Sequence, residues 1–400
     1  RIWPAPRSGC VPPPTPGRHR TRPRRAPHPR PPPPRPVPAN PSPLRSLLIP
    51  LHTSARRTAL WLTAVVTATL TASACTTSDS NDTDTTAKAD RTASPAPAAD
   101  PALTKQQALA QIVHYSKINN QANATHNRRL LDTIEDGPLY AMSIADYKQD
   151  EGLPKADRET YKRWSYNLAS TTVYVPRFAA GQQRWFAAVT YSGKADRYAR
   201  LLVMAEQATT KRWEMVSSVD LDDKKQLPKI ALDADGYATA LDATSAKNVS
   251  APVDVLRTAV GDNFATGGDM SGKNLFATAK ASTRQIKVHD KTIRKFGTRG
   301  TTAFSAASPE FTDSYAFKTA NDSALVVFAH THTQRDTVAP GLEIIPDKDD
   351  RAWLGTTNSP YFTYTFTCSD VATVPTTAGK STLLGYTCRR TDAHGMATSS

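Results

Sequence analysis

The chain has 400 residues, a formal net charge of +14 and 39% hydrophobic residues. Its positive charge is gathered at one end, because residues 1–57 contain 12 arginines and no acidic residue. The remainder is therefore close to neutral, which removes the argument that overall charge would give for a nucleic-acid-binding function. We expect no nucleic-acid partner.

Residues 1–50 hold 18 of the 31 prolines. Proline removes backbone donors and fixes φ, and this stretch has few apolar side chains to bury, so the composition predicts a disordered or polyproline-like leader. One interpretation makes it a basic, proline-rich ligand arm. The other is that it is translated from an upstream region, with the natural start between Val37 and Leu48.

Residues 51–75 have the organisation of an export signal. Arg45, Arg56 and Arg57 supply positive charge, and an apolar core of 13 residues follows at Thr58–Leu70. As a helix this core would span roughly 20 Å, which is short of the ~30 Å hydrocarbon layer. The pattern therefore predicts a signal peptide and disfavours a permanent membrane span.

The end of this signal, Ala72-Ser73-Ala74-Cys75, resembles the lipobox of bacterial lipoproteins. The resemblance implies cleavage between Ala74 and Cys75 and a diacylglyceryl group, carrying chains such as palmitate, on the Cys75 thiol. Ala72 departs from the pattern, which prefers leucine there. The same small residues also suit ordinary signal peptidase. Two locations stay open: a lipid anchor on the extracytoplasmic face of the membrane, or release as a secreted protein.

Residues 76–102 form a low-complexity Ser/Thr/Asp/Ala segment that ends in Pro-Ala repeats. It lacks the apolar residues needed to offset the entropy of ordering, so we expect a flexible linker. Its length predicts a reach of roughly 25 to 30 Å.

The first α+β unit is expected at 103–221. Thr104 and Gln107 have the spacing of a capping box, which predicts a helix from there through Leu131. A second helix is expected near 155–168. Period-two patterns predict an antiparallel meander with strands at 171–178, 183–191, 198–207 and 212–219.

A connector is expected at 222–250, and a second α+β unit at 251–400. In the connector Asp233–Gly236 has some features of a calcium loop but lacks its first carboxylate and closing glutamate, so a simple turn is preferred. A helix at 253–264 is followed by predicted strands at 314–319, 324–333, 361–368 and 381–389. The repeated order of helices and meander predicts a tandem duplication.

Helix-plus-curved-sheet units of this size resemble the nuclear-transport-factor-2-like cone, an α+β roll that encloses a pocket. Residues 56–400 as a whole also resemble an uncharacterised family of actinobacterial, Streptomyces-type surface lipoproteins that carry a domain of unknown function. This second resemblance rests on the signal, the tether and the folded part together. It implies a cell-surface location and transfers no activity. We expect a non-catalytic protein that binds a small apolar ligand or an envelope protein, without a cofactor.

An enzyme of the same fold is the alternative. Known catalytic motifs are missing from the sequence, but His330 and His332 would face the same side of a strand and could bind one metal ion. No third ligand is identifiable, so pocket-lining or surface histidines are the other interpretation. Thr333–Asp336 suggests a strand leaving the core for solvent. Asp132, Glu135 and Asp136 could act as pocket carboxylates, or they could be ordinary charges at a helix end.

Two cysteines fall in the second unit. Cys368 and Cys388 flank a predicted turn and would lie nearly opposite each other in an antiparallel pair. An exported protein permits a disulfide between them, whereas free buried thiols are the alternative.

Overall fold

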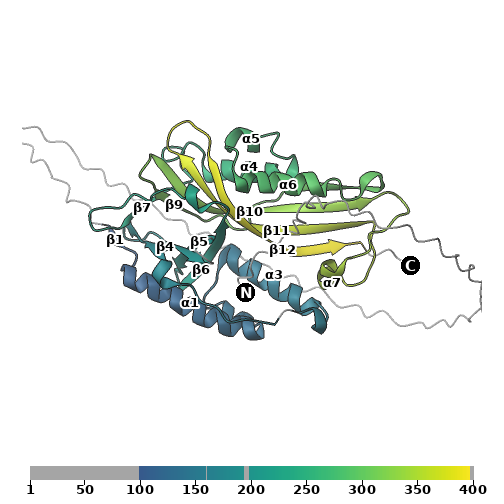
Figure 1. Cartoon of the computed structure of the whole chain (residues 1–400), viewed down its shortest axis with the longest axis horizontal. Coiled ribbons are helices and arrows are strands. Elements are labelled where there is room, and N and C mark those ends of the chain that lie inside the picture. Colours follow the sequence, from purple (N-terminus) through teal and green to yellow (C-terminus); the bar gives the residue numbers. More distant parts are fainter. Residues whose placement is uncertain (1–98, 159, 193–197, 397–400) are drawn as a thin grey trace, which may run out of the picture. The chain divides into compact units, whose positions relative to one another are not determined.

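The computed structural model describes residues 99–158, 160–192 and 198–396. The expected leader, signal peptide and lipid acceptor Cys75, with nearly all of the linker, lie outside the described residues. The described residues belong to one compact unit (Figure 1). In this part of the chain no helix combines the length and apolar character needed to cross a bilayer.

Helix α1 (Lys105–Thr125) begins at the predicted capping box, which is confirmed. The Gln107 amide donates to the Thr104 hydroxyl oxygen, and the Thr104 amide donates to the Gln107 side chain. The helix ends earlier than predicted because His126 adopts a left-handed conformation with φ of 50°. A separate turn, α2 (Arg128–Leu131), completes the predicted range.

The helix predicted at 155–168 is wrong. That range contains one short 3-10 turn, η1 (Lys155–Asp157), and a second, η2 (Leu168–Ser170), begins at its last residue. The second long helix is instead α3 (Gly137–Gly152), with Pro138 in its first turn, where proline is tolerated. Its buried residues recur at helical spacing, a pattern that 155–168 lacks. These buried apolar residues are Leu139, Met142, Ala145 and Tyr147.

A four-stranded antiparallel sheet follows, in the order β2-β4-β5-β6. Its strands are β2 (Thr172–Tyr174), β4 (Trp185–Ser192), β5 (Tyr198–Glu206) and β6 (Trp213–Leu221). The strand predicted at 171–178 splits at Val175, since β3 (Pro176–Phe178) joins a different sheet. Strand β4 is covered on both faces, so its buried residues do not alternate with exposed ones.

An eight-stranded mixed sheet has the order β1-β3-β7-β9-β10-β11-β12, with β8 beside β10. The pair β3 and β7 is parallel, and the other pairs are antiparallel. Besides β3, its strands are β1 (Asp100–Pro101), β7 (Ala238–Leu241), β8 (Gly300–Ala306), β9 (Ser314–Lys318), β10 (Ser323–Val338), β11 (Tyr361–Pro375) and β12 (Thr382–Gly395).

Strand β10 organises this sheet. One of its edges pairs with β11 along nearly the whole strand. The other edge is shared, because β9 pairs with 324–328 and β8 pairs with 332–338. The predicted exit to solvent after His332 holds only in part. Exposure does rise after His332 and Arg335 is exposed, but β10 continues to Val338, and Asp336 is fully buried where the Lys295 ammonium and the Thr302 hydroxyl donate to it.

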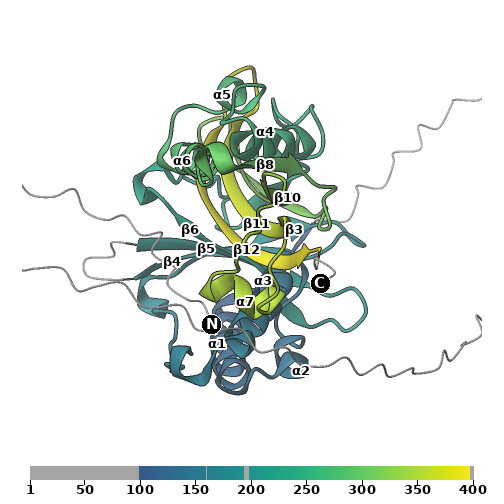
Figure 2. The same cartoon turned by 90° about the vertical axis from the view of Figure 1, so that its right-hand side faces the viewer.

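Three helices cover one face of β10–β12: α4 (Val253–Ala265), α5 (Gly272–Leu275) and α6 (Lys280–Thr292). The four-stranded sheet and α3 lie on the other face (Figures 1 and 2). The remaining short helices are η4 (Lys224–Gln226), η5 (Gly297–Arg299) and α7 (Lys348–Leu354). Strand β10 therefore has two apolar faces: Leu325 and Val327 enter the larger core, while Val326 and Phe328 pack under α4.

The coarse class, α+β with two sheets and flanking helices, agrees with the prediction. A division into separate units at 103–221 and 251–400 stays a prediction. Strands from both ranges share the eight-stranded sheet, and the larger core draws apolar side chains from both.

Candidate functional site

His330, Cys368 and Cys388 form a lateral row across three neighbouring strands. In the ladder His330 of β10 lies opposite Cys368 of β11, and Cys368 lies opposite Cys388 of β12. A disulfide joins the two cysteines, as the sequence predicted. Because side chains that lie opposite each other point to the same face of a sheet, the row faces α4 and α6. Strand extension places both cysteines in mid-strand, where the sequence had placed them at strand ends.

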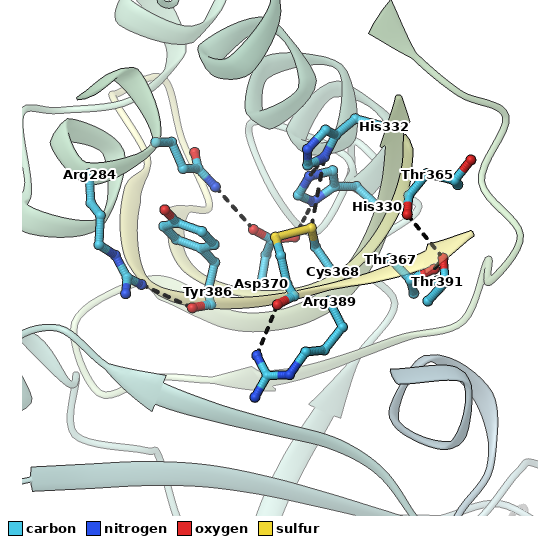
Figure 3. Close-up of a disulfide and its surroundings, with 12 residues drawn as sticks. Arg284, His330, His332, Thr365, Thr367, Cys368, Asp370, Tyr386, Arg389 and Thr391 are labelled. Atoms are coloured by element: carbon cyan, nitrogen blue, oxygen red, sulfur yellow. Dashed lines mark hydrogen bonds and ion pairs between the residues drawn. A yellow bond between two sulfur atoms is a disulfide. The ribbon is translucent and has the colours of Figure 1, made fainter. Parts of the chain in front are cut away.

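Two more residues, each two positions further along its strand, lie on the same face as the row. His332 follows His330 on β10, and Asp370 follows Cys368 on β11. Figure 3 shows the two imidazoles and Asp370 gathered on one side of the strands, with Arg389 on the opposite side. The two histidines thus share one face, as period-two spacing predicts, and each is only 3% exposed.

The His330 ring is held by a carboxylate. Its Nδ1 lies 2.5 Å from Oδ2 of Asp370, a fully buried residue. An ionised carboxylate can only accept, so Nδ1 of His330 carries the proton, and Nε2 is left to face the second histidine. Nε2 lies 3.2 Å from Nδ1 of His332.

Two residues of the covering helices continue the hydrogen bonding beyond Asp370. Gln285 of α6 donates from Nε2 to Oδ1 of Asp370 over 3.3 Å, and Asn263 of α4 donates from Nδ2 to Oε1 of Gln285 over 2.8 Å. Both amides are fully buried. The result is one continuous hydrogen-bonded chain from α4 through α6 and β11 to β10, ending beside the disulfide.

His332 lies in an aromatic slot. Its ring stacks on Phe264 of α4, with centroids 4.2 Å apart, and on Phe366 of β11, with centroids 5.1 Å apart. Burial, together with the neighbouring His330, lowers the pKa of His332 well below its ordinary value. The imidazole is therefore neutral at neutral pH, and one of its ring nitrogens has a lone pair that can accept a hydrogen bond or bind a metal ion.

The cluster contains three groups of metal-binding type within a small radius. One ligand atom each from His330, Cys368 and Cys388 lies within 4.8 Å of the others, and Nδ1 of His332 is 3.8 Å from Sγ of Cys368. Cys368 is fully buried, whereas Cys388 is half-buried. Imidazole and thiolate are ligands that zinc and other soft divalent metals prefer, but thiolates become available only when the disulfide is open.

The pocket carboxylates considered from sequence do not form a cluster of this kind. Glu135 lies between the end of α2 and the start of α3, but it is buried and therefore not an ordinary helix-end charge. The Tyr115 hydroxyl and the Asn119 amide donate to its Oε1 over 2.6 and 2.9 Å. Burial raises the pKa of Glu135 to about 7. Asp136 precedes α3 at its N-cap, and Asp132 ends α2, so each of these two does lie at a helix end.

Other acidic loops are also engaged internally. Asp233–Gly236 forms a turn, as preferred from sequence, and Arg177 lies 2.7 Å from Asp233. In the glycine-rich segment 266–272, three successive backbone amides donate to Oδ2 of Asp262 over 2.7 to 3.1 Å. Such amides suit an external anion, but here the protein's own carboxylate takes that place.

Sequence reasoning identified His330, His332 and both cysteines but missed Asp370, Gln285 and Asn263. Asp370 stands two residues after Cys368, but the predicted strand ended at Cys368, so the signal appears only once β11 is known to extend to Pro375. The two amides had no such signal, because they come from helices far away in sequence. The predicted lipid acceptor Cys75 and the cleavage residue Ala74 lie outside the described residues.

Comparison with known proteins identifies one matching family and two related lipoproteins. Residues 99–395 match the model of Domain of unknown function (DUF8094). The chain is 57% identical over 305 residues to Uncharacterized lipoprotein SCO6871 of Streptomyces coelicolor, which covers 76% of this chain and 86% of the relative. It is 24% identical over 290 residues to Uncharacterized lipoprotein SCO2278 of the same organism, covering 71% and 84%. No solved structure matches the chain.

Proposed function

Because the chain belongs to the DUF8094 family and is 57% identical to a Streptomyces lipoprotein, we propose that it is an extracytoplasmic lipoprotein anchored through Cys75. The observation that carries the proposal is the coincidence of a lipobox-like Ala72–Cys75 with a relative named as a lipoprotein. The Cys368–Cys388 disulfide supports it, because disulfides persist in oxidising compartments outside the cytoplasm.

The experiment expresses the chain in an actinobacterial host and separates membranes from culture supernatant. Mass spectrometry of the mature N-terminal peptide is expected to show Cys75 as the first residue, with two acyl chains on its sulfur through glycerol. Cys75→Ala should abolish incorporation of a labelled fatty acid. Cys10→Ala, which removes a cysteine outside the lipobox, should leave it intact.

The competing outcome is also defined. An unmodified N-terminus at residue 75 in the supernatant would mean release by ordinary signal peptidase after Ala74, and the anchor would be rejected in favour of a secreted protein.

For the folded part we propose a non-catalytic role in binding a small apolar ligand or an envelope protein. Its support is that the residues of catalytic type are enclosed by protein. His330, His332 and Glu135 are each at most 3% exposed, and side chains of the protein contact both ring nitrogens of His330 and Oε1 of Glu135. An enzyme needs such groups where substrate can reach them. Native mass spectrometry of protein extracted from membranes in mild detergent tests this, because a retained apolar molecule would add a discrete mass.

The alternative is an enzyme of cone-like fold that uses pocket carboxylates or His330 and His332. Glu135 favours it, since a carboxyl with a pKa of about 7 is suited to proton transfer near neutral pH. Its enclosure by Tyr115 and Asn119 argues against access. The resemblance to a nuclear-transport-factor-2-like cone remains part of this proposal and rests on the order of helices and strands.

A further inference from the structure

Four nitrogen and sulfur atoms converge at the lateral row on the face below α4. We propose that reduction of the Cys368–Cys388 disulfide by a thiol converts the row into a tetrahedral zinc site with ligands His330, His332, Cys368 and Cys388. This inference goes beyond the anchored binding protein proposed above and does not depend on lipidation of Cys75.

The distances between the potential ligand atoms fit one ion. Bond lengths of about 2.0 Å to nitrogen and 2.3 Å to sulfur place tetrahedral ligands roughly 3.3 to 3.8 Å apart. Nε2 of His330 and Nδ1 of His332 are 3.2 Å apart, and Nδ1 of His332 is 3.8 Å from Sγ of Cys368. Cys388 belongs with His330 and Cys368 to a group of three whose ligand atoms lie within 4.8 Å of one another, and His332 joins this group through its contacts with His330 and Cys368. Two of the spacings of the zinc site thus exist before the disulfide opens.

The surroundings of the row are those of a supported metal ligand. A histidine that binds a metal commonly donates its other ring N–H to a carboxylate, which orients the ring and raises its basicity. Asp370 accepts from Nδ1 of His330, and Gln285 and Asn263 hold that carboxylate in turn. All three supporting residues have no exposed surface. A buried polar chain of this length is not required to hold a disulfide.

The chemistry balances with a thiol as the reductant. A thiolate attacks one sulfur of the disulfide and forms a mixed disulfide, and the other cysteine leaves as a thiolate. A second thiol then displaces the first cysteine, so that two thiols are oxidised to one external disulfide and two protein thiols are formed. Binding of Zn²⁺ to the two cysteines releases two protons and leaves zinc bound by two thiolates and two neutral imidazoles.

Access to the disulfide is asymmetric. Cys388 is half-buried, whereas Cys368 is covered completely. The external thiolate therefore reaches the sulfur of Cys388, and Cys368 is the leaving group. The second imidazole, His332, lies beside that departing thiolate. With the disulfide intact only the two nitrogens remain as ligands, so metal occupancy follows the redox state of the pair.

The test uses the full chain with Cys10→Ala and Cys75→Ala, so that Cys368 and Cys388 are its only cysteines. The protein is reduced with a phosphine, incubated anaerobically with Zn²⁺ and desalted, and bound zinc is counted by elemental mass spectrometry. One zinc per chain is expected after reduction, and less than a tenth of that in the unreduced protein. Co²⁺ should give thiolate-to-metal charge-transfer absorption and the intense visible bands of tetrahedral sites.

Variants separate this site from adventitious binding. His330→Ala and Cys388→Ser should lose the cobalt charge-transfer signal or weaken it strongly. Asp370→Asn should weaken zinc binding by roughly 10- to 100-fold, because it removes the carboxylate that orients a ligand. His394→Ala is the matched control, since this exposed histidine lies on β12, the strand of Cys388, and should change nothing.

Circular dichroism shows whether the reduced chain stays folded, and the proposal can fail in either case. If the reduced chain unfolds, zinc should restore its native spectrum, and failure to do so would overturn the proposal. If it stays folded, the proposal is overturned by absence of stoichiometric zinc, by equal uptake in the oxidised chain, or by unchanged affinity in His330→Ala.

Discussion

Nδ1 of His330 lies 2.5 Å from Oδ2 of Asp370, and solvent reaches almost none of either residue. The pair joins β10 to β11 beside the Cys368–Cys388 disulfide, and amides from two helices hold it in place. Buried pairs of this kind are costly to break, because removing one partner leaves the other without compensation.

Asp370→Asn should therefore lower the free energy of unfolding by roughly 2 to 3 kcal/mol, since it removes a charged acceptor of two buried donors. Denaturant titration measures the change. Asp392→Asn is the control: Asp392 is an exposed residue of β12 that lies 3.7 Å from the equally exposed imidazole of His394, so the change should stay within about 0.5 kcal/mol. Equal effects of the two substitutions would show that the His330–Asp370 pair carries no special weight.

Glu135 should make stability depend on pH. Burial raises its pKa to about 7 in the folded chain, whereas an unfolded glutamate titrates near its ordinary value of about 4.3. Between these values the folded state binds more protons than the unfolded state. The free energy of unfolding should therefore fall as pH rises from about 5 to 7.

Glu135→Gln removes this titration and should flatten that part of the pH profile, measured by thermal unfolding at successive pH values. Glu151→Gln is the control, because Arg128 lowers the pKa of Glu151, which then titrates below this window. A wild-type slope that persists in Glu135→Gln would contradict the assignment.

Asp262 predicts a dependence on acid with the opposite sign. Burial opposes ionisation of Asp262. The backbone amides of 270–272 and the Thr266 hydroxyl nevertheless donate hydrogen bonds to its carboxylate and hold its pKa below the ordinary value. Its stabilising contribution is present above the unfolded pKa near 4 and is lost as pH falls through the lower folded value.

Asp262→Asn should therefore cost about 2 kcal/mol at pH 7, because charge-assisted bonds become neutral ones. Asp269→Asn, which changes an exposed carboxylate paired with Lys273, is the matched control and should cost little. Unchanged stability in Asp262→Asn would refute the role given to this carboxylate.

Much of the local structure could be predicted from sequence. The capping box at Thr104 started a helix, and period-two spacing put His330 and His332 on one face, because these signals depend only on neighbours in the chain. The disulfide could be anticipated since only two cysteines were left in the folded part.

Other features depended on packing that no local pattern encodes. The polar run Thr333–Asp336 indicated a strand that leaves the core, but Lys295 and Thr302 satisfy Asp336 in the interior, so the strand continues. Glu135 was compatible with a surface helix end until tertiary structure enclosed it. Gln285 and Asn263 join the site only because α4 and α6 pack on the same strands.

Contact between the two sheets gives a further prediction. A Cβ added at Gly385 of β12 would lie 2.3 Å from the backbone oxygen of Asp220 in β6, far inside van der Waals distance. Gly385→Ala should force the sheets apart and lower the free energy of unfolding by about 1 to 3 kcal/mol. Gly261 lies within α4, and a Cβ added there would lie 3.5 Å from Cβ of Ala306 in β8, an ordinary van der Waals distance. Gly261→Ala should therefore be neutral or stabilising. If both variants were equally stable, close packing of β12 on β6 would be wrong.

The central claim is that one metal ion binds to four side chains once the disulfide opens: His330, His332, Cys368 and Cys388. X-ray absorption spectroscopy tests this claim most directly. The sample is the reduced, zinc-loaded full chain with Cys10→Ala and Cys75→Ala. The account predicts two sulfur neighbours at about 2.3 Å and two nitrogen neighbours at about 2.0 Å around zinc. A shell of only nitrogen and oxygen, or one that is unchanged in Cys388→Ser, would contradict it.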